Sequence, residues 1–351
     1  MDRDDHRDDL PAADLDRLRR ASRLDLVADI GGTNSRFALS DPDADTLALL
    51  APRSLRNAGF DSLESALASY LQDLPRRPSR AAIAVASPVD RDHIRLTNLH
   101  WSFRRSTLAQ HTGLDEVRLL NDFGAVAHAV PVLAAADRRH IAGPERDGLS
   151  GPVSVIGPGT GLGVALLAGG HRQGWQVVET EGGHASFAPL DEIERDIERS
   201  LRERHGRVSI ERVLCGDGLA HIDQMLRARA AGGEAADVER RQPAEVTRAA
   251  VAGGDAWAGA ALARFCAILG SVAGDIALTH GARTLVIAGG IVPRFVEVLR
   301  ASDFPARMID KGRMRDYLRE VSVHVVTHAH PGLLGAAQLL RGRGHSGCPA
   351  A

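Results

Sequence analysis

Lysine is almost absent from this chain, since Lys311 is the only lysine among 43 Lys and Arg residues. A P-loop requires lysine within Gly-Lys-Ser/Thr, whereas Lys311 lies in Asp-Lys-Gly-Arg. Protein kinases and Schiff-base enzymes also need a lysine within a supporting motif, and Lys311 has none. If the protein binds phosphate, then backbone amides, a metal ion, threonine and arginine must do so.

Cysteine and aromatic residues are scarce as well. Cys215, Cys266 and Cys348 are far apart and form no Cys-x-x-Cys pair, which argues against a zinc site and favours a reducing compartment. An aromatic fraction of 4% and a net charge of -2 disfavour nucleic acid and anionic lipid as partners. No apolar run approaches a membrane span, and the charged N-terminus lacks the core of a signal peptide. We therefore expect a cytoplasmic protein.

The apolar runs predict an α/β protein. Strands alternate with helices, and 351 residues suggest two domains. Residues 1–23 alternate acidic and basic side chains, so we expect a disordered tail with at most a short helix around Asp14–Arg20. Gly253–Thr279 is Ala-rich and apolar on one side, which predicts a buried helix that breaks near Gly270–Gly274.

One short phrase occurs twice in the chain. Gly32–Leu39 (GTNSRFAL) recurs as Gly159–Leu166 (GTGLGVAL), and each copy follows an apolar run. Two ordinary hairpins would explain this pattern, but an internal repeat usually reports a duplicated architecture. Because glycine has no Cβ, such a turn lets backbone N–H groups crowd around an anion. Two turns of this kind could hold one polyphosphate.

Carboxylates lie near the ends of two predicted strands. Asp29 precedes Gly31-Gly32-Thr33, where it could hold Mg²⁺ directly or through water, or merely cap the turn. Asn121 and Asp122 follow the predicted strand Val117–Leu120, where α/β sheets place ligands. Asp122 is therefore either a general base or the N-cap of the next helix.

Three further features are weak when taken singly. His184 in Glu181-Gly182-Gly183-His184 is either a ligand or a structural histidine, and the two glycines argue against the helical Glu-x-x-His metal site. Glu211 opens a predicted helix and could simply complement its dipole. Gly289-Gly290, between a strand and a helix, would let a flat ring approach the backbone, but such turns are common.

Taken together, these segments resemble the bacterial glucokinases of the hexokinase/actin/Hsp70 superfamily. The matching segments occur in the family's order between Leu24 and Arg341: Asp29–Asn34, Thr97-Asn98 with Trp101, Leu120–Phe123, Gly157–Gly163, Glu181–His184, Glu211–Leu214, Ala288–Arg294 and Pro331–Gly335. No single segment is specific, but the combination is.

The resemblance implies two α/β domains of ribonuclease H-like (actin-like ATPase) type with the active site in a cleft between them. It also implies transfer of the γ-phosphate of Mg-ATP to the 6-hydroxyl of glucose. The expected boundaries are a tail over 1–23, a small domain over 24–132 plus 328–351, and a large domain over 133–327. We expect a homodimer that binds glucose and ATP, without nucleic acid or membrane.

The resemblance also implies residue roles. Asp122 is the expected catalytic base, and the expected sugar ligands are Asn121, Glu181, His184 and Glu211. Asp29 is the expected magnesium ligand. The expected ATP contacts are Asp29, Gly31, Gly32, Thr33, Asn34, Gly159, Thr160, Gly161, Gly289 and Gly290.

The chain departs from the family pattern at Gly216-Asp217-Gly218, where relatives often carry Gly-Pro-Gly, and it has no cysteine cluster of the zinc type. Two other functions stay open at this point. One is a kinase for another hexose or a hexosamine. The other is a non-catalytic sugar sensor on the same scaffold, because fold alone does not define function.

Overall fold

The computed structural model describes residues 12–72, 74–87, 89–96, 99–233 and 235–341. The chain forms two compact units. The first unit extends to Val132 and resumes at Ala329, and the second comprises Leu133–His328. The expected division placed the second boundary one residue earlier, between 327 and 328.

The first unit is built on a five-stranded sheet with the order β3-β2-β1-β4-β7 and carries a separate two-stranded ribbon. Its strands are β1 (Asp25–Ile30), β2 (Asn34–Ser40), β3 (Leu50–Arg56), β4 (Arg80–Val85), β5 (His93–Arg95), β6 (Ser102–Arg104) and β7 (Glu116–Asn121). Its helices are α1 (Ala12–Arg20), α2 (Leu63–Gln72), α3 (Arg105–Thr112), α4 (Asp122–Ala129) and α13 (Pro331–Arg341), with 3-10 turns η1 (Asn57–Gly59) and η2 (Val130–Val132).

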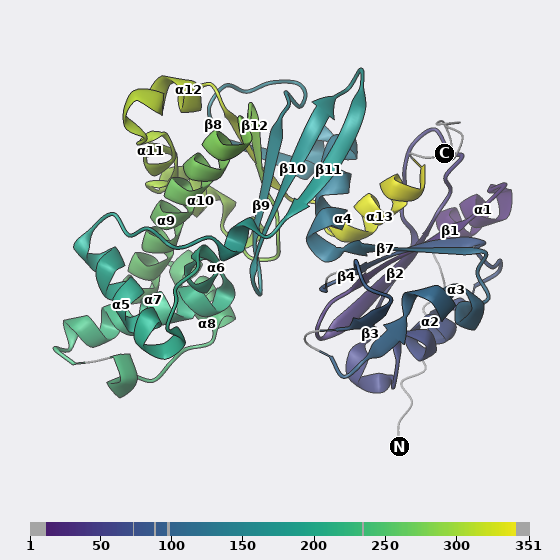
Figure 1. Ribbon diagram of the computed structural model, residues 1–351, viewed down its shortest axis with the longest axis horizontal. Coiled ribbons are helices and arrows are strands. Elements are labelled where there is room, and N and C mark those ends of the chain that lie inside the picture. The colour runs from purple at the N-terminus through teal and green to yellow at the C-terminus, as the bar shows by residue number, and fades with distance from the viewer. Residues whose placement is uncertain (1–11, 73, 88, 97–98, 234, 342–351) are drawn as a thin grey trace. The chain divides into compact units, whose positions relative to one another are not determined.

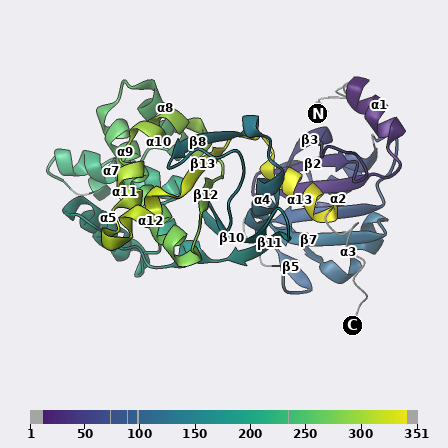
Figure 2. The same ribbon diagram turned by 90° about the horizontal axis from the view of Figure 1, so that it is seen from above.

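Both faces of this sheet are covered, which explains the continuous apolar run Leu26–Ala28 within β1. Leu26, Ala28 and Ile30 pack into a core shared with α2 and α3. Val27, which points to the opposite face because strand side chains alternate, packs into the core formed with α4 and α13. Figures 1 and 2 both show α4 and α13 lying side by side on that face.

The second unit is built on a six-stranded sheet with the order β11-β10-β9-β12-β13-β8. Its strands are β8 (Arg138–Ala142), β9 (Val153–Pro158), β10 (Leu162–Gly170), β11 (Gly174–Thr180), β12 (Thr284–Ile287) and β13 (Ser322–Val326). Its α-helices are α5 (Glu192–His205), α6 (Ile210–Val213), α7 (Gly216–Ala230), α8 (Pro243–Ala252), α9 (Ala256–His280), α10 (Val296–Ala301), α11 (Phe304–Ile309) and α12 (Arg315–Arg319). The 3-10 turns are η3 (Ala135–Asp137), η4 (Gly182–His184), η5 (Ala235–Asp237), η6 (Val292–Arg294) and η7 (Gly312–Met314).

The two sheets repeat one topology, which confirms the duplication predicted from the repeated phrase. In the first unit, β2 pairs antiparallel with β1 and β3, whereas β1, β4 and β7 are parallel. In the second, β10 pairs antiparallel with β9 and β11, whereas β9, β12 and β13 are parallel. One Gly-rich turn joins β1 to β2, and the other joins β9 to β10.

The short helix expected around Asp14–Arg20 is confirmed, but the expectation of a disordered tail over 1–23 is wrong for that part of the chain. Ala12–Arg20 forms α1, in which Leu18 is fully buried in the core of the first unit. The Asp14 carboxylate also accepts a hydrogen bond from the backbone N–H of Ala51 at 3.0 Å. The buried leucine was hidden from sequence reasoning by the charged residues around it. Residues 1–11 lie outside the described part of the chain.

The expectation of a broken helix near Gly270–Gly274 is also wrong, because α9 continues through both glycines. A Cβ on Gly270 would lie 2.9 Å from the Cα of Phe304, and one on Gly274 would lie 3.2 Å from the carbonyl carbon of Met308. These glycines therefore permit α11 to approach α9 closely. The two glycines do not interrupt α9.

Helix α9 corrects one further expectation, that no apolar run approaches the length of a membrane span. Its 25 residues are long and apolar enough for a span, with a mean hydropathy of 1.6 over the most apolar window. Because 72% of that window is buried inside the protein, α9 is a core helix of the second unit.

Candidate active site

The predicted residues of the first unit gather at one edge of its sheet. Ile30 is in register with Val85, and Val85 is in register with Asn121. These strands are parallel, so their carboxyl ends meet at the same edge. With strands about 4.8 Å apart, the ends of β1 and β7 are roughly 10 Å from each other. The Asp29 region and the Asn121-Asp122 pair therefore border the same edge.

The carboxylate of Asp29 lies beside an arginine at that edge. Its carboxylate is 3.5 Å from Nη1 of Arg36, the residue opposite it on β2. A Cβ on Gly332, in the first turn of α13, would lie 3.1 Å from the Asp29 carboxyl carbon. Burial raises the pKa of Asp29 above its usual value, while Arg36 and His330 act in the opposite direction.

The turn after β1 is held from one side by Asn57. The turn itself closes through a 3.1 Å hydrogen bond from Gly31 N–H to Asn34 O. Nδ2 of Asn57 donates to Gly31 O at 2.7 Å, and its backbone N–H donates to Thr33 O at 3.0 Å. Gly32 and Thr33 are exposed at the tip of the turn.

At the end of β7, Asn121 is the N-cap of α4. Its Oδ1 accepts hydrogen bonds from the N–H groups of Phe123 (2.9 Å) and Gly124 (3.1 Å). The cap uses the amide oxygen, which leaves the NH₂ group of Asn121 able to donate to a ligand. Asp122, the first residue of α4, is thus not the N-cap, although its Oδ1 also accepts from Phe123 N–H at 2.7 Å.

In the second unit, the Gly159–Gly161 turn is held by the backbone. Gly159 N–H donates to Gly161 O at 2.8 Å, and Gly216 N–H, at the start of α7, donates to Gly159 O at 2.9 Å. Gly289 has a φ of +89° and lies against the carbonyl of Pro158. The turn, the first residue of α7 and the Gly289-Gly290 segment therefore meet at one end of the sheet.

Glu211 connects this turn to the other predicted ligands. Its Oε2 accepts a hydrogen bond from Leu162 N–H at 2.9 Å, immediately after the turn. Its Oε1 lies 3.9 Å from Nδ1 of His184, and Nε2 of His184 lies 3.8 Å from Oε2 of Glu181. These distances are too long for direct hydrogen bonds, so the groups retain the capacity to bond a ligand hydroxyl or a water. The side chains of Glu181 and His184 are 78% and 58% exposed, so they are accessible to a ligand.

Local packing brings this cluster together. Ile210 N–H donates to Ala185 O at 2.9 Å, which ties the start of α6 to the end of η4. The Arg207 guanidinium donates to His184 O at 2.8 Å. A Cβ on Gly182 would lie 3.0 Å from Cγ1 of Val164, so the glycines let this segment rest directly on β10.

The comparisons with known proteins decide the family. The family model described as Glucokinase matches residues 26–343. The chain belongs to the glucokinase family. The glucokinase of Hahella chejuensis is 44% identical over 321 residues, which cover 90% of this chain and 96% of that protein.

Solved glucokinase structures share the architecture. A glucokinase from an Antarctic psychrotroph has 36% identity and a TM-score of 0.79, and the match covers 91% of this chain and 99% of that one. A ROK family glucokinase from Streptomyces griseus, solved with glucose and AMPPNP, has a TM-score of 0.61 at 20% identity and covers 90% and 98%. At that identity it supports the fold alone.

One departure from the glucokinase pattern, Asp217 between two glycines, has a structural partner. The Asp217 carboxylate pairs with Arg240 at 2.6 Å, and Arg240 also donates to the Asp217 carbonyl at 2.9 Å. Gly218 is tightly enclosed, because a Cβ there would lie 2.5 Å from the carbonyl carbon of Val213. The ion pair thus joins Arg240 to the first turn of α7.

Sequence reasoning missed three residues that shape this glucokinase-like site: Arg36, Asn57 and Arg207. The matching register of β1 and β2 could have indicated Arg36, since it lies opposite Asp29. Nothing in the local sequence indicates Asn57 or Arg207. Thr97-Asn98, part of the glucokinase resemblance, lies outside the described residues. Among the described residues, no group of three or more His, Cys, Asp or Glu could hold a metal ion.

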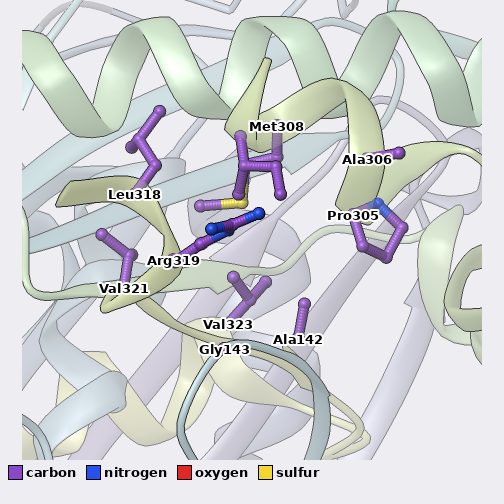
Figure 3. A pocket seen from close by; sticks show the side chains of 10 residues that line it. Ala142, Gly143, Pro305, Ala306, Met308, Leu318, Arg319, Val321 and Val323 are labelled. Atoms are coloured by element: carbon purple, nitrogen blue, oxygen red, sulfur yellow. The ribbon is translucent and has the colours of Figure 1, made fainter. Parts of the chain in front are cut away.

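The second unit also contains a hollow away from these residues. It has a volume of about 270 Å³ and is lined by apolar side chains, including Met308, Leu318 and Val323, with Arg319 among them (Figure 3). Its walls come from β8, α11, α12 and β13. None of the predicted glucokinase residues lines it.

Proposed function

We propose that the protein is an ATP-dependent glucokinase that transfers the γ-phosphate of Mg-ATP to the 6-hydroxyl of glucose. The observation that carries the proposal is the position of Glu211. One oxygen of its carboxylate bonds the N–H after the Gly159–Gly161 turn, and the other faces His184. Groups suited to sugar hydroxyls thus adjoin a turn suited to phosphate, as a sugar kinase requires.

The sugar ligands follow from donor and acceptor chemistry. The carboxylates of Glu181 and Glu211 accept hydrogen bonds from hydroxyls, whereas His184 and the NH₂ group of Asn121 can donate to hydroxyl oxygens. A sugar ring presents both kinds of group, so this set can orient it through several hydroxyls. Asn121 belongs to the first unit, and Glu181, His184 and Glu211 belong to the second.

The phosphates of ATP would be held by the N–H groups of the two Gly-rich turns and by Mg²⁺. Asp29 suits Mg²⁺, which takes oxygen ligands and retains several waters, so one carboxylate together with phosphate oxygens is sufficient. Bound magnesium neutralises charge on the phosphates. We assign Gly289 and Gly290 to the adenosine of ATP, because the space beside Gly290 is open to a flat ring. No heavy atom lies within 4 Å of a Cβ built on Gly290.

Asp122 is the proposed general base. Asn121 is the N-cap of α4, so Asp122 does not have that role. The carboxylate of Asp122 follows the end of β7, whereas that of Asp29 lies near the end of β1. The 6-hydroxyl oxygen attacks the γ-phosphorus, its proton passes to the Asp122 carboxylate, and the bond between the γ-phosphorus and the bridging oxygen breaks to release ADP. Phosphoryl transfer depends chiefly on such positioning and on charge stabilisation.

The proposal is tested by measuring ADP release from Mg-ATP with a panel of sugars, with and without EDTA. We expect the highest kcat/KM with glucose and loss of activity on removal of Mg²⁺. A higher kcat/KM with another hexose or a hexosamine would assign that sugar as the substrate. Glucose binding by calorimetry without any ADP release would instead indicate a sugar sensor.

A further inference from the structure

We propose that Asn57 is a positioning residue that directs the N–H groups of the Gly31–Asn34 turn toward the phosphates of ATP. This inference rests on the proposed function, because it concerns the same nucleotide site. Asn57 is 2% exposed and lies directly after β3, as the first residue of η1. It is neither a predicted ligand nor part of any motif noted in the sequence.

Every polar group of Asn57 has a partner in the first unit. Nδ2 donates to Gly31 O at 2.7 Å, and Oδ1 accepts from Ser35 Oγ at 2.7 Å. The backbone N–H donates to Thr33 O and the carbonyl accepts from Phe60 N–H, both at 3.0 Å. A carbonyl oxygen only accepts, so the amide nitrogen must be the atom that faces Gly31 O.

These bonds determine which way the peptide units of the turn point. In a planar trans peptide the C=O and the N–H point in opposite directions. With Gly31 O directed toward Asn57, the N–H of Gly32 in the same peptide points away from it. With Thr33 O directed toward Asn57, the N–H of Asn34 points away in the same manner. The side of the turn opposite Asn57 therefore presents two N–H groups, which is the arrangement that an anion requires.

The second turn shows why a side chain is needed in the first. There, the carbonyl of Gly159, which matches Gly32 in the repeat, is held by the backbone N–H of Gly216, so the helix start orients a peptide of that turn. In the first turn, Gly31 and Gly32 lack a Cβ and their shared peptide can rotate at little steric cost. The amide of Asn57 supplies the hydrogen bond that holds this peptide in one orientation.

The test compares Asn57→Asp with Ser35→Ala. Asn57→Asp preserves shape but, at neutral pH, places a carboxylate oxygen against Gly31 O in place of the donor. Ser35→Ala removes the other buried hydrogen bond of Asn57 and leaves the bond to Gly31 intact, so it is the matched control for stability. Steady-state kinetics give KM for Mg-ATP and for glucose separately, calorimetry gives Mg-ATP and glucose affinity, and thermal unfolding gives Tm.

For Asn57→Asp we expect KM for Mg-ATP to rise roughly 10-fold or more and kcat to fall, because a buried acceptor loses its donor. KM for glucose should stay within about twofold. Ser35→Ala should lower Tm while KM for Mg-ATP stays near the wild-type value. An unchanged Mg-ATP affinity in Asn57→Asp, or equal losses for both substrates, would refute the positioning role. If the wild type lacks glucokinase activity, the proposed function fails, and calorimetry with Mg-ATP still decides the role of Asn57.

Discussion

Gly335→Ala should impair both stability and turnover by forcing apart α4 and α13, which lie side by side on one face of the first unit's sheet. Gly335 lies in α13 against α4. A Cβ there would lie 2.7 Å from the carbonyl carbon of Ala125 and 2.9 Å from the nitrogen of Ala129, and it would overlap Ala125 O. All of these atoms are backbone, so no side-chain rotation can relieve the overlap.

The expected magnitudes follow from this geometry. Carbon atoms in contact are about 3.5 Å apart, so the 2.7 Å separation requires a shift of at least roughly 0.8 Å. Overpacking of this kind costs about 1–3 kcal/mol, which lowers Tm by about 2–4 °C per kcal/mol for a domain of this size. Asp122 opens α4, and a misplacement of about 1 Å can cost about 100-fold in rate. We therefore expect kcat to fall by about 10- to 100-fold.

The assay is ADP release at saturating glucose and Mg-ATP, with circular dichroism for Tm. The matched control is Gly259→Ala in α9, where no heavy atom lies within 4 Å of the added Cβ. Because alanine favours helix over glycine by up to about 1 kcal/mol, this control should leave Tm unchanged or raise it. Wild-type kcat and Tm in Gly335→Ala would refute the close-contact reasoning. A lower Tm with wild-type kcat would show that the shift does not reach Asp122.

Two further predictions concern the site itself. Asp122→Asn should retain glucose binding and lower kcat by about 10²–10⁴-fold, the usual contribution of a general base; turnover within a few-fold of wild type would remove Asp122 from that role. Gly161→Ala should lower kcat/KM for glucose by about 10-fold, because the new Cβ overlaps Oε2 of Glu211 and lies 3.1 Å from its carboxyl carbon. Gly254→Ala is its control, since Gly254 lies outside the site and no heavy atom lies within 4 Å of its added Cβ, and equal kinetics for the two variants would contradict the coupling through Glu211.

The sequence predicted the parts of the site that are encoded locally. Both Gly-rich turns, and the placement of Asn121 and Asp122 at a strand end, are visible as glycine or polar residues beside apolar runs. The repeat was recognisable because each copy retains the same order of small and apolar residues. Each of these signals lies within about ten residues of the feature that it predicts, so no tertiary information was needed.

The parts that were missed depend on contacts between distant segments. The bond between Leu162 N–H and Glu211 joins residues 49 apart, and the bond from Asn57 to Gly31 joins residues 26 apart. The break expected near Gly270–Gly274 failed for the same reason. A glycine that ends a helix and one that admits a neighbouring helix look alike in sequence, and only the position of α11 distinguishes them.

The scarcity of lysine has a consequence for how phosphate can be held. Nζ of Lys311 lies 2.7 Å from the carboxylate of Asp275 within the second unit, and the Lys311 side chain is only 15% exposed. The charge of Lys311 is therefore paired with that of Asp275. In the proposed site, charge compensation would then come from magnesium, from arginine and from peptide N–H groups. A peptide dipole acts on an anion only when it is oriented toward it. Residues that orient peptides, such as Asn57 at one turn and Gly216 at the other, should therefore affect ATP binding although they carry no charge.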